Sequence, residues 1–180
     1  MGWHWIVGIV VLGVLILWFM YMYNDMANRQ RRIDEWWDEV DSHLKLRHDL
    51  VPLLMEKARV LMKDESDALD RLADLCGKAE TDSEDEDLEY IENGLSIALR
   101  NFKRSARNHA SAMLDIDFLK LMGELVSIEG RASSACREHN NLVGEFNVSI
   151  RKFPANLVVG FLHFHPREMR IFAGPEGEGQ

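Results

Sequence analysis

The feature that most constrains this chain is an apolar run over residues 3–23, which contains no Asp, Glu, Lys or Arg. A helix of about 20 apolar residues is long enough to cross the ~30 Å hydrocarbon core of a bilayer. Aromatic rings with a polar edge favour the headgroup layer. Five of them lie near the ends of the run: Trp3, Trp5, Trp18, Tyr21 and Tyr23. We therefore predict a transmembrane anchor over residues 1–24.

A cleaved signal peptide is the alternative interpretation of this run, and three features disfavour it. No basic residue precedes the run, its apolar core is too long, and its end lacks a small-residue cleavage site. Lys and Arg close to a span stay on its cytoplasmic side, and Arg29, Arg31 and Arg32 all follow the run. We expect the amino terminus outside and residues 25–173 in the cytoplasm.

Composition limits what the remainder of the chain can be. Its length suits one domain, and the net charge of -9 argues against nucleic acid as a partner. Cys76 and Cys136 are too few for a disulfide framework, and a cytoplasmic domain keeps thiols reduced. We expect the tail, residues 174–180, to be disordered.

Apolar residues recur at steps of three and four, which is typical of helices with one buried face. The pattern predicts that the span continues into a first long helix, kinked or restarted at Pro52, that passes Cys76 and stops at Gly77. A second helix runs from Leu88 to Met113. After a turn at residues 115–117, a third runs from Leu119 to a stop near Phe153-Pro154. The predicted fold is all-α: a transmembrane helix leading into an antiparallel, up-and-down bundle of three long helices, with a short C-terminal helix or segment.

Two blocks of residues carry specificity. One lies just beyond the predicted span and the other in the third predicted helix; together they comprise Asn24, Trp36, Trp37, Asp41, Leu44, Arg47, Asp49 and Pro52, then Asn140, Val143, Phe146, Asn147, Ile150, Phe153 and Pro154. Over most of residues 3–172 the chain resembles the LemA family, with His139 and Phe146 where tyrosine is usual. The resemblance implies a protein of the bacterial inner membrane with a cytoplasmic antiparallel helical bundle and no assigned catalytic activity.

Asn140 and Asn147 are seven residues apart and share a helix face with Val143 and Ile150. Polar side chains in an apolar seam can fix register and partner number, so one interpretation is a seam that pairs with another subunit or protein. Alternatively, both amides bond to the first helix of the same chain, at Asp41 or Arg47. Trp36 and Trp37 leave a similar choice between core, membrane surface and subunit contact.

Residues with catalytic or ligating potential are few. His163, His165 and Glu168 are the best metal candidates, although zinc sites normally gather three or four fixed ligands. His48-Asp49 looks like half of a catalytic dyad but has no nucleophile motif beside it. His43 and Arg47 share a face, and we expect them at the surface. We expect no cofactor.

These patterns favour a membrane-anchored, non-enzymatic helical scaffold that assembles with itself. Its expected partners are the lipid bilayer, further copies of the chain, and an unidentified membrane or cytoplasmic protein. Two other functions remain open: a membrane-tethered metal-dependent enzyme or sensor that uses the C-terminal histidines, and a protein that shapes the membrane.

Overall fold

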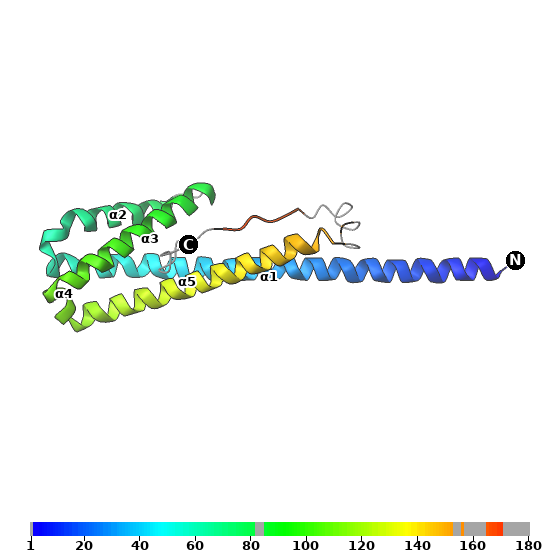
Figure 1. Ribbon diagram of the computed structural model, residues 1–180, viewed down its shortest axis with the longest axis horizontal. Helices are drawn as coiled ribbons and strands as arrows, with labels where there is room; N and C mark the ends of the chain where they lie inside the picture. The colour runs from blue at the N-terminus through cyan, green and yellow to red at the C-terminus, as the bar shows by residue number, and fades with distance from the viewer. Residues whose placement is uncertain (1, 82–84, 153–155, 157–164, 171–180) are drawn as a thin grey trace. The chain divides into compact units, whose positions relative to one another are not determined.

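The computed structural model describes residues 2–81, 85–152, 156 and 165–170, and within them it contains helices and no strand (Figure 1). The all-α prediction is therefore confirmed for this part of the chain. The elements are α1 (Trp3–Leu61), the 3-10 helix η1 (Lys63–Glu65), α2 (Ser66–Thr81), α3 (Asp85–Asn108), α4 (Ala110–Leu114) and α5 (Ile116–Ser149).

The chain divides into two compact units. The first contains the described residues up to Trp36 and those between Glu138 and Met169. The second contains the described residues between Trp37 and Arg137, together with Arg170. Helices α1 and α5 each supply residues to both units, and each unit is considered by itself below.

Helix α1 is longer than an ordinary globular helix and is uninterrupted. Its 59 residues make about 90 Å at 1.5 Å per residue. Pro52 lies inside it, and the helix continues to Leu61, so it does not restart at Pro52. The predicted extension to Cys76 is wrong because the polar residues after Leu61 form η1 instead and interrupt the apolar stripe.

Helix α2 is therefore a separate element, which makes four long helices rather than three. Gly77 lies within α2 and does not stop it. One glycine inside a helix costs only about 1 kcal/mol, which packing on the apolar face can offset. Arg59 pairs with Asp70, and further from the turn the Cys76 thiol approaches the His48 carbonyl. These contacts make α1 and α2 antiparallel, so Cys76 does not lie at the far end of the first helix as predicted.

The second unit has a continuous apolar core. Phe102 of α3 meets Phe118 of α5 edge-on, with ring centroids 6.4 Å apart. Further along, Lys103 of α3 pairs with Glu129 of α5. The remaining buried side chains of this core recur at helical spacing: Leu50, Val51, Leu54, Met55 and Ala58 of α1, Met62 just after it, Leu69, Leu72 and Cys76 of α2, Leu95, Leu99 and Ala106 of α3, Ala112 of α4, and Leu125 of α5.

The helices at the end of this core are separated by single residues. His109 adopts an extended conformation between α3 and α4. Asp115 does the same between α4 and α5, where its carboxylate accepts a hydrogen bond of 2.8 Å from the Phe118 backbone N–H. This is the geometry of a helix N-cap. The predicted turn at residues 115–117 is therefore confined to Asp115, because α5 already begins at Ile116.

The first unit has a smaller core. Met26 and Ile33 of α1 are buried against Val143 and Phe146 of α5 and against Ile150, which directly follows α5. The half-buried Met22 and Leu142 pack beside them. Residues 165–170 are not helical, so the short C-terminal helix is not found in that stretch (Figure 1).

Candidate functional site

Arg47 is the most unusual side chain in the second unit, because it is charged and only 1% exposed. It occupies a position on the apolar stripe of α1, three or four residues from the buried Leu44, Leu50 and Val51. We expected Arg47 at the surface beside His43, and that prediction is wrong. A buried guanidinium requires an anion and further acceptors to offset its lost hydration.

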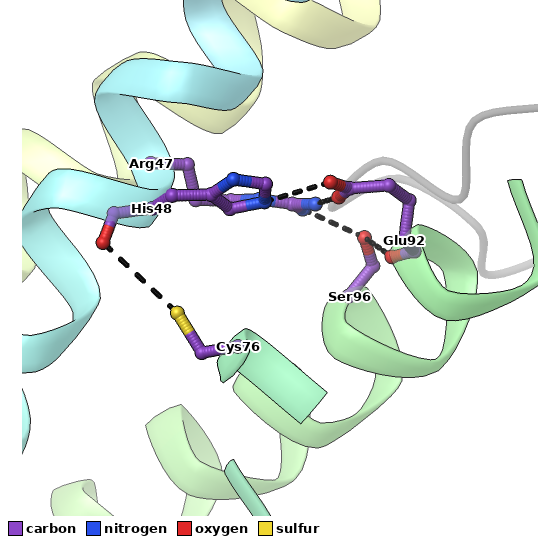
Figure 2. A network of polar contacts seen from close by, with 5 residues as sticks. All are labelled: Arg47, His48, Cys76, Glu92 and Ser96. Atoms are coloured by element: carbon purple, nitrogen blue, oxygen red, sulfur yellow. Dashed lines mark hydrogen bonds and ion pairs between the residues drawn. The ribbon is translucent and has the colours of Figure 1, made fainter. Parts of the chain in front are cut away.

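Glu92 of α3 supplies the anion, and Figure 2 shows how its carboxylate bridges two consecutive residues of α1. One carboxylate oxygen pairs with the Arg47 guanidinium. The other lies 2.7 Å from the Nε2 atom of His48. Ser96, one turn further along α3, accepts a hydrogen bond of 2.8 Å from Arg47 Nη1 and donates one of 2.9 Å to the Glu92 carbonyl. The network thus fixes the register of α3 against α1.

A second ion pair lies in the same unit, and it too matches a cation with a carboxylate. Lys103 of α3 pairs with Glu129 of α5, and their side chains are 12% and 4% exposed. Desolvation by burial lowers the pKa of Arg47 to about 10, while the attraction of Glu129 opposes that shift. Arg47 therefore stays charged at neutral pH, and each buried cation faces a carboxylate.

The contacts of Cys76 and His48 run in different directions within this network. The Cys76 thiol points to the His48 carbonyl, 4.0 Å away, whereas the His48 ring points to Glu92 (Figure 2). Asp49, the residue after His48, is exposed. Both cysteines are buried, and they are not joined in a disulfide.

The other predicted residues of the first block have simpler environments. Leu44 is buried, whereas Asp41 pairs with Lys45 at 2.6 Å on the surface. Trp36 and Trp37 are both half-buried. The Arg170 guanidinium lies over the Trp37 ring, 4.3 Å from its centroid, so one of the two tryptophans contacts the chain's own C-terminal segment.

Asn147 makes the contact that sequence reasoning missed in the first unit. Its side-chain amide donates to the Arg167 carbonyl at 2.7 Å and accepts from the Arg167 N–H at 2.9 Å. The Arg167 guanidinium pairs with Asp34 of α1 at 2.9 Å. Asn147 therefore bonds within its own chain, as one alternative held, but to the C-terminal segment rather than to the first helix. The Asn140 side chain lies 3.3 Å from the Nδ1 atom of His139.

The structure describes two of the three C-terminal residues that were candidate metal ligands. His165 and Glu168 are exposed, while His163 lies outside the described residues, as do Phe153 and Pro154. Among the described residues, no group of three His, Cys, Asp or Glu side chains is placed to hold a metal ion. The interpretation of the three C-terminal residues as a metal site thus gains no support from the part of the chain that the structure describes.

The apolar run keeps its side chains on the outside of α1. Trp3, Trp5 and Tyr21 are more than 70% exposed, and Trp18 and Tyr23 are 38% and 46% exposed. The run is the one stretch among the described residues that is long and apolar enough to cross a membrane, and none of it is buried. Asn24, Arg29, Arg31 and Arg32 are exposed as well, and Arg29 pairs with Asp25 at 2.9 Å.

Helices with a charged network inside one unit, and an N-terminal helix long enough to span a bilayer, define this as an all-helical protein with a candidate membrane span. The model of the LemA family matches residues 36–178, which is most of the chain. The chain therefore belongs to the LemA family. A comparison with curated proteins found no match.

Proposed function

We propose that this protein is a membrane-anchored, non-enzymatic helical scaffold that assembles with further copies of itself at the cytoplasmic face of a bacterial inner membrane. The observation that carries the proposal is the contrast in side-chain exposure between the two parts of α1. Ile9, Leu12 and Leu17 are 59–69% exposed, whereas Val40, Val51 and Leu54 of the same helix are fully buried. A continuous apolar surface of that length is not stable in water and is matched by lipid.

Two further observations support a scaffold. The charged side chains inside the second unit are paired with one another, which leaves them as structural rather than reactive groups. Apolar side chains are also exposed well away from the predicted span. Leu114 and Ile116, at the junction of α4 and α5, are 81% and 82% exposed. Exposed apolar side chains that gather in one place are typical of contact surfaces.

The cytoplasmic placement is supported by the arginines that follow the run. Arg31 and Arg32 are exposed on α1, within 10 residues of Tyr23. Basic residues this close to a span are retained on the cytoplasmic side. Residues 25–173 then face the cytoplasm and the amino terminus faces outward.

Light scattering of the full-length protein in a mild detergent tests assembly. We expect a mass several times that of one 20.8 kDa chain at micromolar concentration. A matched variant, Leu114→Glu with Ile116→Glu, should reduce that mass if the exposed junction contributes. A strict monomer, together with the absence of any crosslinked partner in intact membranes, would refute the scaffold.

A further inference from the structure

The first unit holds an extended piece of polypeptide by its backbone. The Asn147 amide satisfies both the N–H and the C=O of Arg167, at 2.9 and 2.7 Å, as a neighbouring β-strand would. Such a pair of bonds recognises an extended backbone irrespective of its side chain. Asn147, near the C-terminal end of α5, therefore acts as a clamp: its one side chain binds both backbone groups of a residue in an extended peptide.

Two side-chain contacts make the clamp selective. Asp34 of α1 accepts the Arg167 guanidinium at 2.9 Å. Gly144, one turn before Asn147, leaves room for Met169, because a Cβ atom built there would come within 3.2 Å of the Met169 Cε atom. An arginine followed two residues later by methionine thus fits this surface, and residues 167–169 of this chain have that pattern.

The bound segment is held loosely. Pro166 and Met169 are exposed, the latter at 58%, so the segment buries little apolar surface. The side chains of the Arg167–Asp34 pair are 42% and 54% exposed, and exposed ion pairs contribute little to stability. The same contacts are available to the identical segment of another copy, and exchanging an identical element is a low-cost route to an assembly.

We propose that the clamp formed by Asp34, Gly144 and Asn147 receives residues 165–169 of a second copy of the chain, so that neighbouring subunits exchange their C-terminal segments. This inference rests on the proposed function, because the membrane anchor supplies what exchange requires. Asp34 lies about 15 Å along α1 from Asn24 at 1.5 Å per residue, so the clamps of all anchored copies lie at one height above the bilayer. Confinement to one plane gives a neighbour's segment a high effective concentration.

Crosslinking between differently tagged full-length chains tests the exchange. One chain carries Arg151→Cys and the other His165→Cys, two exposed positions that are not among the clamp residues Asp34, Gly144 and Asn147. Both chains are expressed in the same membrane and treated with a short bismaleimide. We expect a covalent product that carries both tags. The wild-type chain paired with either single variant gives the background from the buried Cys76 and Cys136. A chain carrying both substitutions shows that the two positions are in reach within one molecule.

The variant Asn147→Ala distinguishes binding of the neighbour's segment by Asn147 from mere proximity of the two chains. It should lower the yield of the two-tag product about tenfold, the change expected when hydrogen bonds of ordinary net strength are lost. Asn141→Ala is the matched control, because Asn141 is exposed on the same helix. A two-tag product that is insensitive to Asn147→Ala overturns the proposal. So does crosslinking confined to the chain with both substitutions; if light scattering still shows assembly in that case, the scaffold stands and another surface joins the subunits.

Discussion

At the scale of single residues, the molecule depends on a charge placed where an apolar side chain is expected. Arg47 interrupts the buried stripe of α1, and its guanidinium is anchored by Glu92 and Ser96 of α3. Buried ion pairs add little net stability relative to a well-packed apolar pair, but losing one partner strands the other charge. The network therefore favours one alignment of α3 on α1 over others.

Replacing Arg47 with methionine should show that losing one partner of the ion pair costs more stability than losing both. We expect Arg47→Met to lower the free energy of unfolding by about 3–5 kcal/mol, because the buried Glu92 carboxylate loses its guanidinium partner. Arg47→Met combined with Glu92→Leu should recover most of that loss. Thermal unfolding of the full-length protein in detergent, followed by helical circular dichroism, measures both variants.

The control for this experiment is Lys45→Met, which removes a cation that is 72% exposed and two positions away on α1. Its effect should stay within about 0.5 kcal/mol. If the double variant is less stable than either single variant, the buried pair contributes through attraction and not merely through mutual neutralisation.

The position of Arg47 was predictable in part. Its place on the stripe of α1 follows from residue spacing alone, and a cation there requires a buried anion on another helix. The sequence does not show which carboxylate pairs with Arg47. The chain has 30 acidic residues, and the position of Glu92 beside the apolar Ile91 does not distinguish it from the others. Glu129 and Lys103 were missed for the same reason. The correct ion pairs depend on how the helices pack against one another, and the spacing of residues along the chain carries no information about that packing.

At the scale of elements, helix type was predictable and helix ends were less so. Steps of three and four identified the helical stretches, because each buries one face, but they did not separate α2 from α1. The end of α1 at Leu61 was missed because no proline or glycine marks it, whereas Gly77 suggested an end that packing overrides. The Asn147 clamp was missed because its partner is backbone, which has no sequence pattern.

Asp115 should contribute measurably as the N-cap of α5. Asp115→Ala removes the acceptor for the Phe118 N–H and should cost about 1 kcal/mol of stability. Asp117→Ala, which loses only the exposed pair with Lys57, should cost less than half as much. Equal losses in chemical denaturation would show that surface charge, and not capping, stabilises the start of α5.

Pro52 offers a substitution in the opposite direction. It lies on the exposed side of an uninterrupted helix, where a proline removes one backbone hydrogen bond. Pro52→Ala should therefore raise the unfolding midpoint by an amount equivalent to about 1–3 kcal/mol. A lower midpoint would indicate that a bend at Pro52 is required by the packing of Val51 and Leu54.

At the scale of the whole molecule, the proposed orientation is open to direct measurement. Gly2→Cys should react with a membrane-impermeant maleimide in intact cells. Tyr90→Cys, at a position that is 82% exposed on α3, should react only after the membrane is permeabilised. The two native cysteines are buried and give the background. Labelling of Tyr90→Cys in intact cells would reverse the proposed topology.

The pairing of α1 with α5 in the first unit also sets the order in which the protein is made. Met26 and Ile33 are covered by Val143, Phe146 and Ile150, which a ribosome synthesises more than a hundred residues later. If the apolar run enters the bilayer as it emerges, the chain is already fixed in place while these two side chains still lack their cover. The first unit then closes only near the end of translation, at the membrane surface, so its assembly is a late event in biosynthesis.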